Sequence, residues 1–268
     1  MIGIFDSGFG GLSILKYFLK SLPDYNYIYL GDNARAPYGS RSEDTIYNYA
    51  KEAMDFLFSK KCKIVIIACN TASAVALRKL QQEYLPKNYP KKRILGIIRP
   101  LAEYAVNDKN IKKLGIIGTK ATINSKVYEK EILKLNSKIK IIRQKAPLLV
   151  PLIEEGWIKK PETKMILKKY LRKLKMKQVD GLILACTHYS FLLKYIQNIM
   201  PKKCKIFNNG EIIAESFKKY INKHTELKIK KSKNPSREFF ITDSVAEFKE
   251  IGEKFLGEKI KMINKIKL

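Results

Sequence analysis

The chain has 268 residues, 46 % of them hydrophobic, so it is long and apolar enough to bury one large core or two smaller ones. This composition excludes a disordered chain, and no apolar run reaches the length of a membrane span, so we expect no membrane partner. The net charge of +28 leaves nucleic-acid binding open, although arginine, the usual base and phosphate ligand, occurs at only eight positions.

Short runs rich in β-branched and apolar residues alternate along the chain with segments of helical spacing. The runs lie at residues 2–5, 27–30, 63–68, 93–98, 113–117, 139–143, 181–185, 205–207 and 238–242. Apolar residues recur at helical spacing within 12–19 and 46–57. This alternation predicts an α/β fold with mostly parallel sheets covered on both faces. Residues 230–235 are the most loop-like segment, and the lysine-rich tail 259–268 is expected on solvated helix faces or in loops.

Two pairs of similar strand–turn segments relate one half of the chain to the other. IIACNTA (66–72) and LILACTHY (182–189) each join an apolar run, one cysteine and a small polar pair. IGIFDSG (2–8) and LGIIGTKAT (114–122) each join an apolar run to a polar turn that contains glycine. Such turns lie at the carboxyl edge of a parallel sheet, where open α/β folds bind ligands. The repeats predict two similar halves, each with one ligand-facing cysteine.

Cys69 and Cys186 are each expected to be the last residue of a strand, facing the N-terminus of the next helix. That position lowers the pKa of a thiol and favours the thiolate, whereas the alternative is a small, inert buried residue. Asn70 and Thr187 can either cap the following helix or bind ligand. Cys62 and Cys204 lie outside such turns and are interpreted as structural.

Other cysteine and glycine chemistries fit the sequence poorly. There is no C-x-x-C pair and there are only two histidines, so neither a metal site nor a redox site is expected. Reduced thiols are typical of a soluble cytoplasmic protein. The segment DSGFGG (6–11) lacks the lysine of a phosphate-binding loop and is interpreted as a turn that lets a ligand approach the backbone.

Racemisation is a reaction that uses two equivalent thiols on opposite sides of a cleft. One base removes a proton from one face of a carbon, and a conjugate acid returns a proton to the other face. A cysteine can serve in either role, because its thiol and its thiolate are both accessible near neutral pH.

The sequence resembles the glutamate racemase family of the cofactor-independent aspartate/glutamate racemase superfamily. The resemblance covers nearly the whole chain. It rests on IGIFDSGFGGLSIL, YLGDNARAPYGSRS, IIACNTASAVAL, IIGTKATINSKVYEKEI, VPLIEEG, GLILACTHYSFLL and FFITDSVAEF, which occur in the family's order. It implies two pseudo-symmetric α/β domains facing a central cleft, the first comprising residues 1–96 plus 209–268 and the second residues 97–208. It also implies a homodimer that interconverts L- and D-glutamate without a cofactor and supplies D-glutamate for peptidoglycan.

The resemblance also implies roles for residues that match the family's motifs. Cys69 and Cys186 correspond to the two catalytic bases, Asp6 to the helper of Cys69, and His188 to the helper of Cys186, with Glu154 as a carboxylate near His188. The substrate-binding positions are Asp6, Ser7, Tyr38, Gly39, Asn70, Thr71, Thr119, Thr122, Thr187 and His188. Each of these residues taken singly has an ordinary structural interpretation, and the ordered set makes those interpretations jointly improbable.

The chain departs from the family's pattern at three positions. Ala185 replaces a glycine before the second cysteine, Ser190 replaces a proline after it, and Arg99 stands where glutamate is common. Arg99 is expected near the crossing between the domains.

Three other functions remain open from the sequence. They are an aspartate or other amino-acid racemase of the same superfamily, a racemase that uses pyridoxal phosphate, and a basic nucleic-acid-binding protein on a racemase fold. Ser73 and His188 follow the glutamate pattern rather than the aspartate one, no cofactor-binding pattern accompanies any lysine, and no specific nucleic-acid partner is expected.

Overall fold

Two parallel sheets form the framework of the chain, which the computed structural model describes from residue 1 to residue 268. The first sheet contains β1 (Ile2–Asp6), β2 (Tyr27–Gly31), β3 (Ile64–Ile67), β4 (Arg93–Gly96), β9 (Arg237–Ile241) and β10 (Ile263–Lys265), in the order β10-β9-β2-β1-β3-β4. The second contains β5 (Lys113–Gly118), β6 (Lys140–Lys145), β7 (Gly181–Ala185) and β8 (Lys205–Ile206), in the order β6-β5-β7-β8. All strand pairs are parallel, which confirms the predicted fold class.

The strand order repeats between the two sheets. The order β2-β1-β3-β4 in the first sheet matches β6-β5-β7-β8 in the second, element by element along the chain. Strand β3, which leads to Cys69, therefore corresponds to β7, which leads to Cys186. Strand β1 corresponds in the same way to β5. The repeated sequence segments thus occupy equivalent places in two halves of the same topology.

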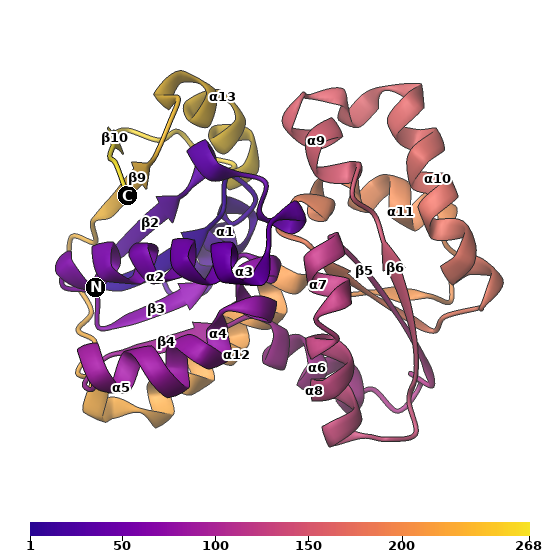
Figure 1. Cartoon of the computed structure of the whole chain (residues 1–268), viewed down its shortest axis with the longest axis horizontal. Helices are drawn as coiled ribbons and strands as arrows, with labels where there is room; N and C mark the ends of the chain where they lie inside the picture. The colour runs from indigo at the N-terminus through magenta and orange to yellow at the C-terminus, as the bar shows by residue number, and fades with distance from the viewer.

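Helices connect the strands and cover the sheets (Figure 1). The α-helices are α1 (Leu12–Ser21), α2 (Glu43–Ser59), α3 (Asn70–Val75), α4 (Leu77–Lys79), α5 (Leu85–Asn88), α6 (Ile98–Asn107), α7 (Lys120–Asn124), α8 (Val127–Leu135), α9 (Leu149–Glu154), α10 (Pro161–Met176), α11 (Leu193–Ile199), α12 (Asn209–Lys223) and α13 (Val245–Leu256). Short 3₁₀ turns lie at η1 (Asn33–Arg35), η2 (Tyr38–Ser40), η4 (Trp157–Lys159), η5 (Thr187–Leu192) and η6 (Thr225–Leu227), and a π turn lies at η3 (Leu80–Tyr84). No helix combines the length and the apolarity needed to cross a bilayer.

Local sequence signals explain where the long helices begin and end. The side chain of Ser42 caps α2 by accepting a hydrogen bond from the backbone N–H of Thr45 at 3.2 Å, and two acidic residues follow in the first turn. Ser244 caps α13 in the same way, and that helix ends at Leu256, just before Gly257, whose φ of +83° suits glycine. The buried residues of α2 recur every three or four positions, so the helix lays one apolar stripe on the sheet.

The nine predicted strands are all present, but the expectation for the tail was wrong. Residues 263–265 form β10, which extends the first sheet by pairing with β9, Ile263 opposite Phe239. The strand has only three residues, too few for an alternating pattern to stand out among lysines. The loop expected at 230–235 is confirmed, since no helix or strand occupies it.

One hydrophobic core joins the two sheets, while a smaller one covers the outer face of the first sheet. Alternation along β1 sends Ile2 and Ile4 into the larger core and Phe5 into the smaller core beneath α2. The larger core continues through α6 and α12 to β5 and β7 of the second sheet. Figure 1 shows the result as two lobes side by side, with both chain termini on the lobe that holds the first sheet. The carboxyl ends of β1, β3, β5 and β7 meet where the lobes adjoin.

Candidate active site

A small cavity of about 20 Å³ lies between the carboxyl edges of the two sheets. Its lining residues come from the turns that follow β1, β3, β5 and β7, and from two further segments, residues 37–39 and helix α9. They are Ser7, Pro37, Tyr38, Gly39, Cys69, Asn70, Thr71, Thr119, Val150, Glu154, Cys186, Thr187 and His188. Every predicted site residue except Asp6 and Thr122 lies in this lining, and both of those hydrogen-bond to residues that do. The structure therefore brings the whole predicted set together.

Cys69 caps the N-terminus of α3 with its own sulfur. Its Sγ accepts a hydrogen bond from the backbone N–H of Ala72 at 3.5 Å and lies 3.4 Å from Oγ of Ser7. Strand β3 ends at Ile67, so Cys69 is two residues beyond the strand rather than its last residue. Cys69 is buried, with 5 % of the residue exposed.

The expectation that the helix N-terminus lowers the pKa of Cys69 was wrong. Burial, reinforced by the nearby carboxylate of Asp6, raises the pKa of Cys69 to about 12, against the opposing hydrogen bonds from Ser7 and Ala72. Helix α3 has only six residues, and its dipole does not compensate for removing the sulfur from water. In this structure the neutral thiol is the stable form of Cys69 near neutral pH.

Cys186 follows directly after β7 and faces a histidine–carboxylate pair. Its Sγ lies 3.8 Å from Nδ1 of His188, and Nε2 of His188 lies 3.1 Å from Oε1 of Glu154. Burial opposes protonation of His188, but the contacts with Cys186 and Glu154 outweigh it and hold the pKa of His188 well above its usual range. A protonated His188 therefore stands beside Cys186 at neutral pH.

Asp6 connects the two half-sites. It is fully buried, its Oδ2 accepts from the backbone N–H of Gly8 at 3.0 Å, and its Oδ1 accepts from the hydroxyl of Thr187 at 3.4 Å. Burial raises the pKa of Asp6, while the positive charge of His188 and the backbone N–H groups of the turn oppose that shift. Asp6 is thus a carboxyl group whose proton affinity is increased, placed beside Cys69 and in contact with the turn after Cys186.

Three threonine hydroxyls form a cluster across the boundary between the halves. Oγ1 of Thr71 lies 3.0 Å from that of Thr119 and 3.3 Å from that of Thr122, and Thr119 donates to Thr122 at 3.0 Å. Hydroxyls can donate and accept, so this cluster can reorient toward a charged group in the cavity.

Glycine is required where the two halves approach most closely. A Cβ on Gly39 would lie 2.6 Å from Cβ of Thr119, and a Cβ on Gly10 would lie 2.2 Å from Oγ1 of Thr187. The turn DSGFGG was expected to let a ligand approach the backbone, and at Gly10 the structure differs, because the close neighbours are Thr187 and His188. Neither Gly10 nor Gly39 has a positive φ, so space rather than backbone conformation selects glycine.

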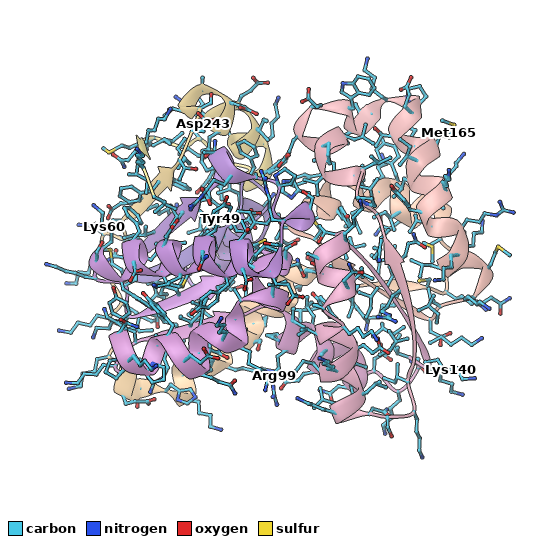
Figure 2. The ribbon with its side chains drawn as sticks, viewed as in Figure 1. Tyr49, Lys60, Arg99, Lys140, Met165 and Asp243 are labelled. Atoms are coloured by element: carbon cyan, nitrogen blue, oxygen red, sulfur yellow. The ribbon has the colours of Figure 1, made fainter.

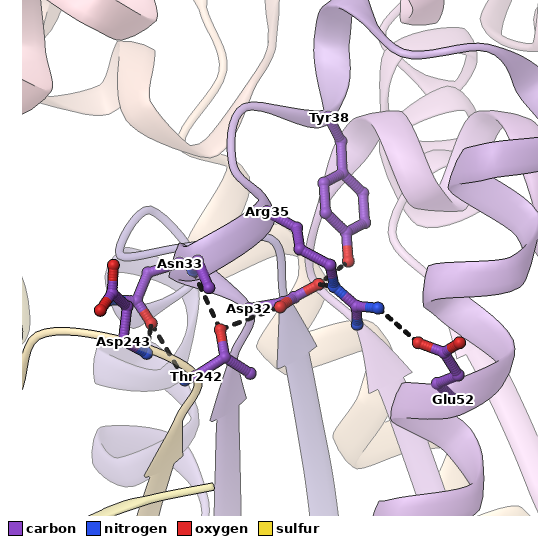
Figure 3. Close-up of polar contacts among 8 residues, drawn as sticks. Asp32, Asn33, Arg35, Tyr38, Glu52, Thr242 and Asp243 are labelled. Atoms are coloured by element: carbon purple, nitrogen blue, oxygen red, sulfur yellow. Dashed lines mark hydrogen bonds and ion pairs between the residues drawn. The ribbon is translucent and has the colours of Figure 1, made fainter. Parts of the chain in front are cut away.

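A buried aspartate that sequence reasoning missed supports the Tyr38–Gly39 turn (Figure 3). Asp32 is fully buried and accepts hydrogen bonds from the hydroxyl of Tyr38, from Nε of Arg35 at 2.7 Å and from the hydroxyl of Thr242 at 2.9 Å. Arg35 in turn pairs with Glu52. The available signal was its position, since Asp32 follows the apolar run 27–30 and one glycine, much as Asp6 follows the run 2–5.

Tyr128 on α8 is the second residue that sequence reasoning missed. Its hydroxyl donates to Oδ1 of Asn70 at 2.6 Å, and its ring is buried. The sequence carries no residue-level signal for it, because a tyrosine at helical spacing is typical of a core position.

Comparison with known proteins agrees with this geometry. The family model described as Asp/Glu/Hydantoin racemase matches residues 13–215. A curated glutamate racemase of Geobacter metallireducens is 37 % identical over 271 residues, covering 100 % of this chain and 96 % of its own length. The chain belongs to the glutamate racemase family.

Solved structures of the family superpose over nearly the whole chain. The glutamate racemase of Francisella tularensis, solved in complex with D-glutamate, aligns with a TM-score of 0.90 at 33 % identity and covers 99 % of this chain and 97 % of its own. A glutamate racemase isoform from Bacillus anthracis aligns with a TM-score of 0.92 at 32 % identity, covering 100 % and 97 %. The chain is therefore an amino-acid racemase, an isomerase, with the racemase fold across both halves.

The departures from the family pattern leave the cavity of this racemase intact. Ala185 is the fully buried last residue of β7, and the hydroxyl of Ser190 donates to the backbone carbonyl of Thr187 at 2.8 Å. Arg99 lies in the first turn of α6, the helix that follows β4 and precedes the second sheet, and pairs with Glu103 at 2.8 Å and Glu131 at 3.9 Å. No group of three or more His, Cys, Asp or Glu side chains is arranged to hold a metal ion, and all four cysteines are free.

Proposed function

We propose that this racemase interconverts L-glutamate and D-glutamate without a cofactor, with Cys69 and Cys186 as its two bases. One observation carries the proposal: two cysteines at topologically equivalent strand ends line a single cavity. The relative from Francisella tularensis, solved with D-glutamate, supports the substrate. The product that we assign, D-glutamate, is a building block of peptidoglycan.

In the proposed reaction, one sulfur acts as thiolate and the other as thiol. The thiolate takes the proton from the α-carbon, and the electron pair of the broken C–H bond stays on that carbon, partly delocalised into the α-carboxylate. The opposite thiol then gives its proton to the other face of the carbon. The product is the mirror-image amino acid, and the two sulfurs have exchanged protonation states.

The substrate itself helps to create the thiolate. Burial holds the Cys69 proton in place, with a pKa of about 12. The α-ammonium group of a bound amino acid brings a positive charge next to the sulfur, which favours the charged form of a buried acid. Asp6 can receive the proton of Cys69, and His188 can exchange a proton with Cys186, so each sulfur has its own partner.

The remaining lining residues supply the contacts that orient the substrate. We propose that Ser7, Tyr38, Gly39, Asn70, Thr71, Thr119, Thr122, Thr187 and His188 bind glutamate, with the threonine cluster at its side-chain carboxylate. A cavity of about 20 Å³ holds roughly one water, so the lobes must separate to admit an amino acid and then close around it. Closure would also exclude water from the reacting carbon.

The wider organisation follows from the same reasoning. We propose that residues 1–96 plus 209–268 move as one domain and residues 97–208 as the other, because each set contains one sheet and one of the two cysteines that line the cavity. We also propose a homodimer in the cytoplasm, which light scattering and cell fractionation can test.

Figure 2 shows nitrogen-tipped side chains projecting around both lobes, from Lys60 at one end to Lys140 at the other, which favours a solvated surface over a dedicated nucleic-acid site.

The direct test follows the optical rotation of L-glutamate incubated with the purified protein without added cofactor or metal. We expect the rotation to decay to zero as D-glutamate accumulates. L-aspartate run in parallel separates this reaction from the aspartate alternative, and a variant with both cysteines replaced by serine controls for contaminating racemase. An unchanged rotation of L-glutamate would overturn the proposal.

A further inference from the structure

The two side-chain amide atoms of Asn70 differ in their hydrogen bonding: the oxygen has a partner and the nitrogen has none. The residue is 2 % exposed, follows Cys69 directly and lines the cavity. Its Oδ1 accepts a hydrogen bond, whereas its Nδ2 is buried and has no partner in the protein. A buried amide nitrogen without a partner costs free energy unless a ligand accepts its hydrogens. The N–H groups of this amide are therefore free to donate to an acceptor bound in the cavity.

The partner of Oδ1 comes from the other half of the chain. Tyr128 lies on α8, after β5, and is 3 % exposed; its hydroxyl donates to Oδ1 of Asn70 at 2.6 Å. Burial raises the pKa of Tyr128, so the hydroxyl keeps its proton at any working pH. Tyr128 is not among the residues that line the cavity, so it acts on a substrate only through Asn70.

We propose that Tyr128 is a positioning residue that holds the Asn70 amide with its N–H groups available to a substrate carboxylate. The inference rests on the proposed function, since it assumes an amino-acid substrate. With Oδ1 occupied by the tyrosine, the amide offers the cavity donors only, which suits an anionic group. A carboxylate would be repelled if the amide were reversed and Oδ1 faced it. The tyrosine bond also polarises the amide and strengthens its N–H groups as donors.

This arrangement differs from a purely structural hydrogen bond in what it controls. A structural bond would affect folding stability alone, and its loss would lower that stability equally with and without bound substrate. A positioning bond affects carboxylate binding, and its effect must vanish once the Asn70 side chain is removed. These two consequences can be measured separately.

The test compares Tyr128→Phe, Asn70→Ala and the double variant in KM, kcat, D-glutamate binding by calorimetry and thermal midpoint. We expect Tyr128→Phe to raise KM and the D-glutamate dissociation constant about tenfold, or about 1.4 kcal/mol, with a smaller change in kcat. The dissociation constant of the double variant for D-glutamate should be no higher than that of Asn70→Ala alone. Tyr27→Phe is the matched control, because the buried Tyr27 hydroxyl donates to the carbonyl of Leu22 at 2.9 Å, at the strand end remote from the cavity. It should lose stability without a change in KM.

The outcomes separate this inference from the proposed function. If the wild type racemises glutamate and Tyr128→Phe binds it as tightly as the wild type, the positioning role is wrong and the function stands. Additive losses in the double variant would equally overturn the role, because they would show that Tyr128 acts independently of Asn70. If the wild type neither racemises nor binds glutamate, the function falls and the inference falls with it.

Discussion

Replacing Gly10 by alanine adds one methyl group where the two half-sites touch. The new Cβ would lie 2.2 Å from Oγ1 of Thr187 and 2.7 Å from Nδ1 of His188, whereas ordinary contacts begin at 3.4 Å. The turn after Cys186 must therefore move away by roughly 1 Å, taking with it the histidine that faces the sulfur. A misplacement of that size costs about 10²-fold in catalysis, and overpacking costs about 1–3 kcal/mol of stability.

The assay measures kcat/KM for glutamate racemisation together with the thermal midpoint. Gly181→Ala is the control, since its Cβ would meet Ile111 at 2.8 Å at the start of the same strand, β7, away from the cavity. We expect both variants to lose stability and only Gly10→Ala to lose about 10²-fold in kcat/KM. A Gly10→Ala enzyme with wild-type kcat/KM would refute the claim that the glycine sets the distance between the half-sites.

Three further predictions concern the support of the site, pH and the surface. Tyr38→Phe removes one hydrogen bond to the buried Asp32. Because a hydrogen bond to a charged group is stronger than a neutral one, kcat/KM should fall about tenfold. Unchanged kinetics would exclude a role for that bond. Burial raises the pKa of Cys62 from 9.0 to about 11, so the folded state favours the neutral thiol. The stability that Cys62 contributes is therefore complete below pH 9 and is lost as the pH rises toward 11. The free energy of unfolding, measured with denaturant between pH 8 and 11, should fall less steeply with pH in Cys62→Ala than in the wild type. Equal slopes in the two proteins would contradict the raised pKa of Cys62. Binding to nucleic acid should be weak, on the order of 10⁻⁴ to 10⁻⁶ M, abolished by moderate salt and without sequence preference, as a fluorescence titration can check.

Periodicity and repetition in the sequence were sufficient to predict the fold class, although not every strand. Apolar runs of strand length separated by helical spacing located nine strands, and the two cysteine turns revealed the repeat that the strand order confirms. Strand β10 was missed because three residues among lysines carry no periodic signal. Its place in the sheet depends on pairing with β9, which is a tertiary contact.

The composition of the site was predictable in part, and its electrostatics were not. Family motifs named the lining residues, but Asp32 and Tyr128 act through hydrogen bonds to partners 6 and 58 positions away. The pKa of Cys69 was predicted in the wrong direction, because its place before a helix was visible in the sequence and the extent of its burial was not. Desolvation is a property of the packed structure, so a motif alone does not reveal it.

The assignment of one base to each face of the substrate can be measured with single-cysteine variants. Serine is a poor base, so Cys69→Ser and Cys186→Ser should each lose racemisation. Elimination needs only one proton abstraction: from a glutamate analogue with a leaving group on C3, loss of the α-proton and the leaving group gives an enamine that hydrolyses to 2-oxoglutarate and ammonia. We expect each variant to release 2-oxoglutarate from one enantiomer of the analogue only, and the two variants to act on opposite enantiomers. Racemisation at the wild-type rate in either variant, or elimination from the same enantiomer by both, would contradict the two-base reaction.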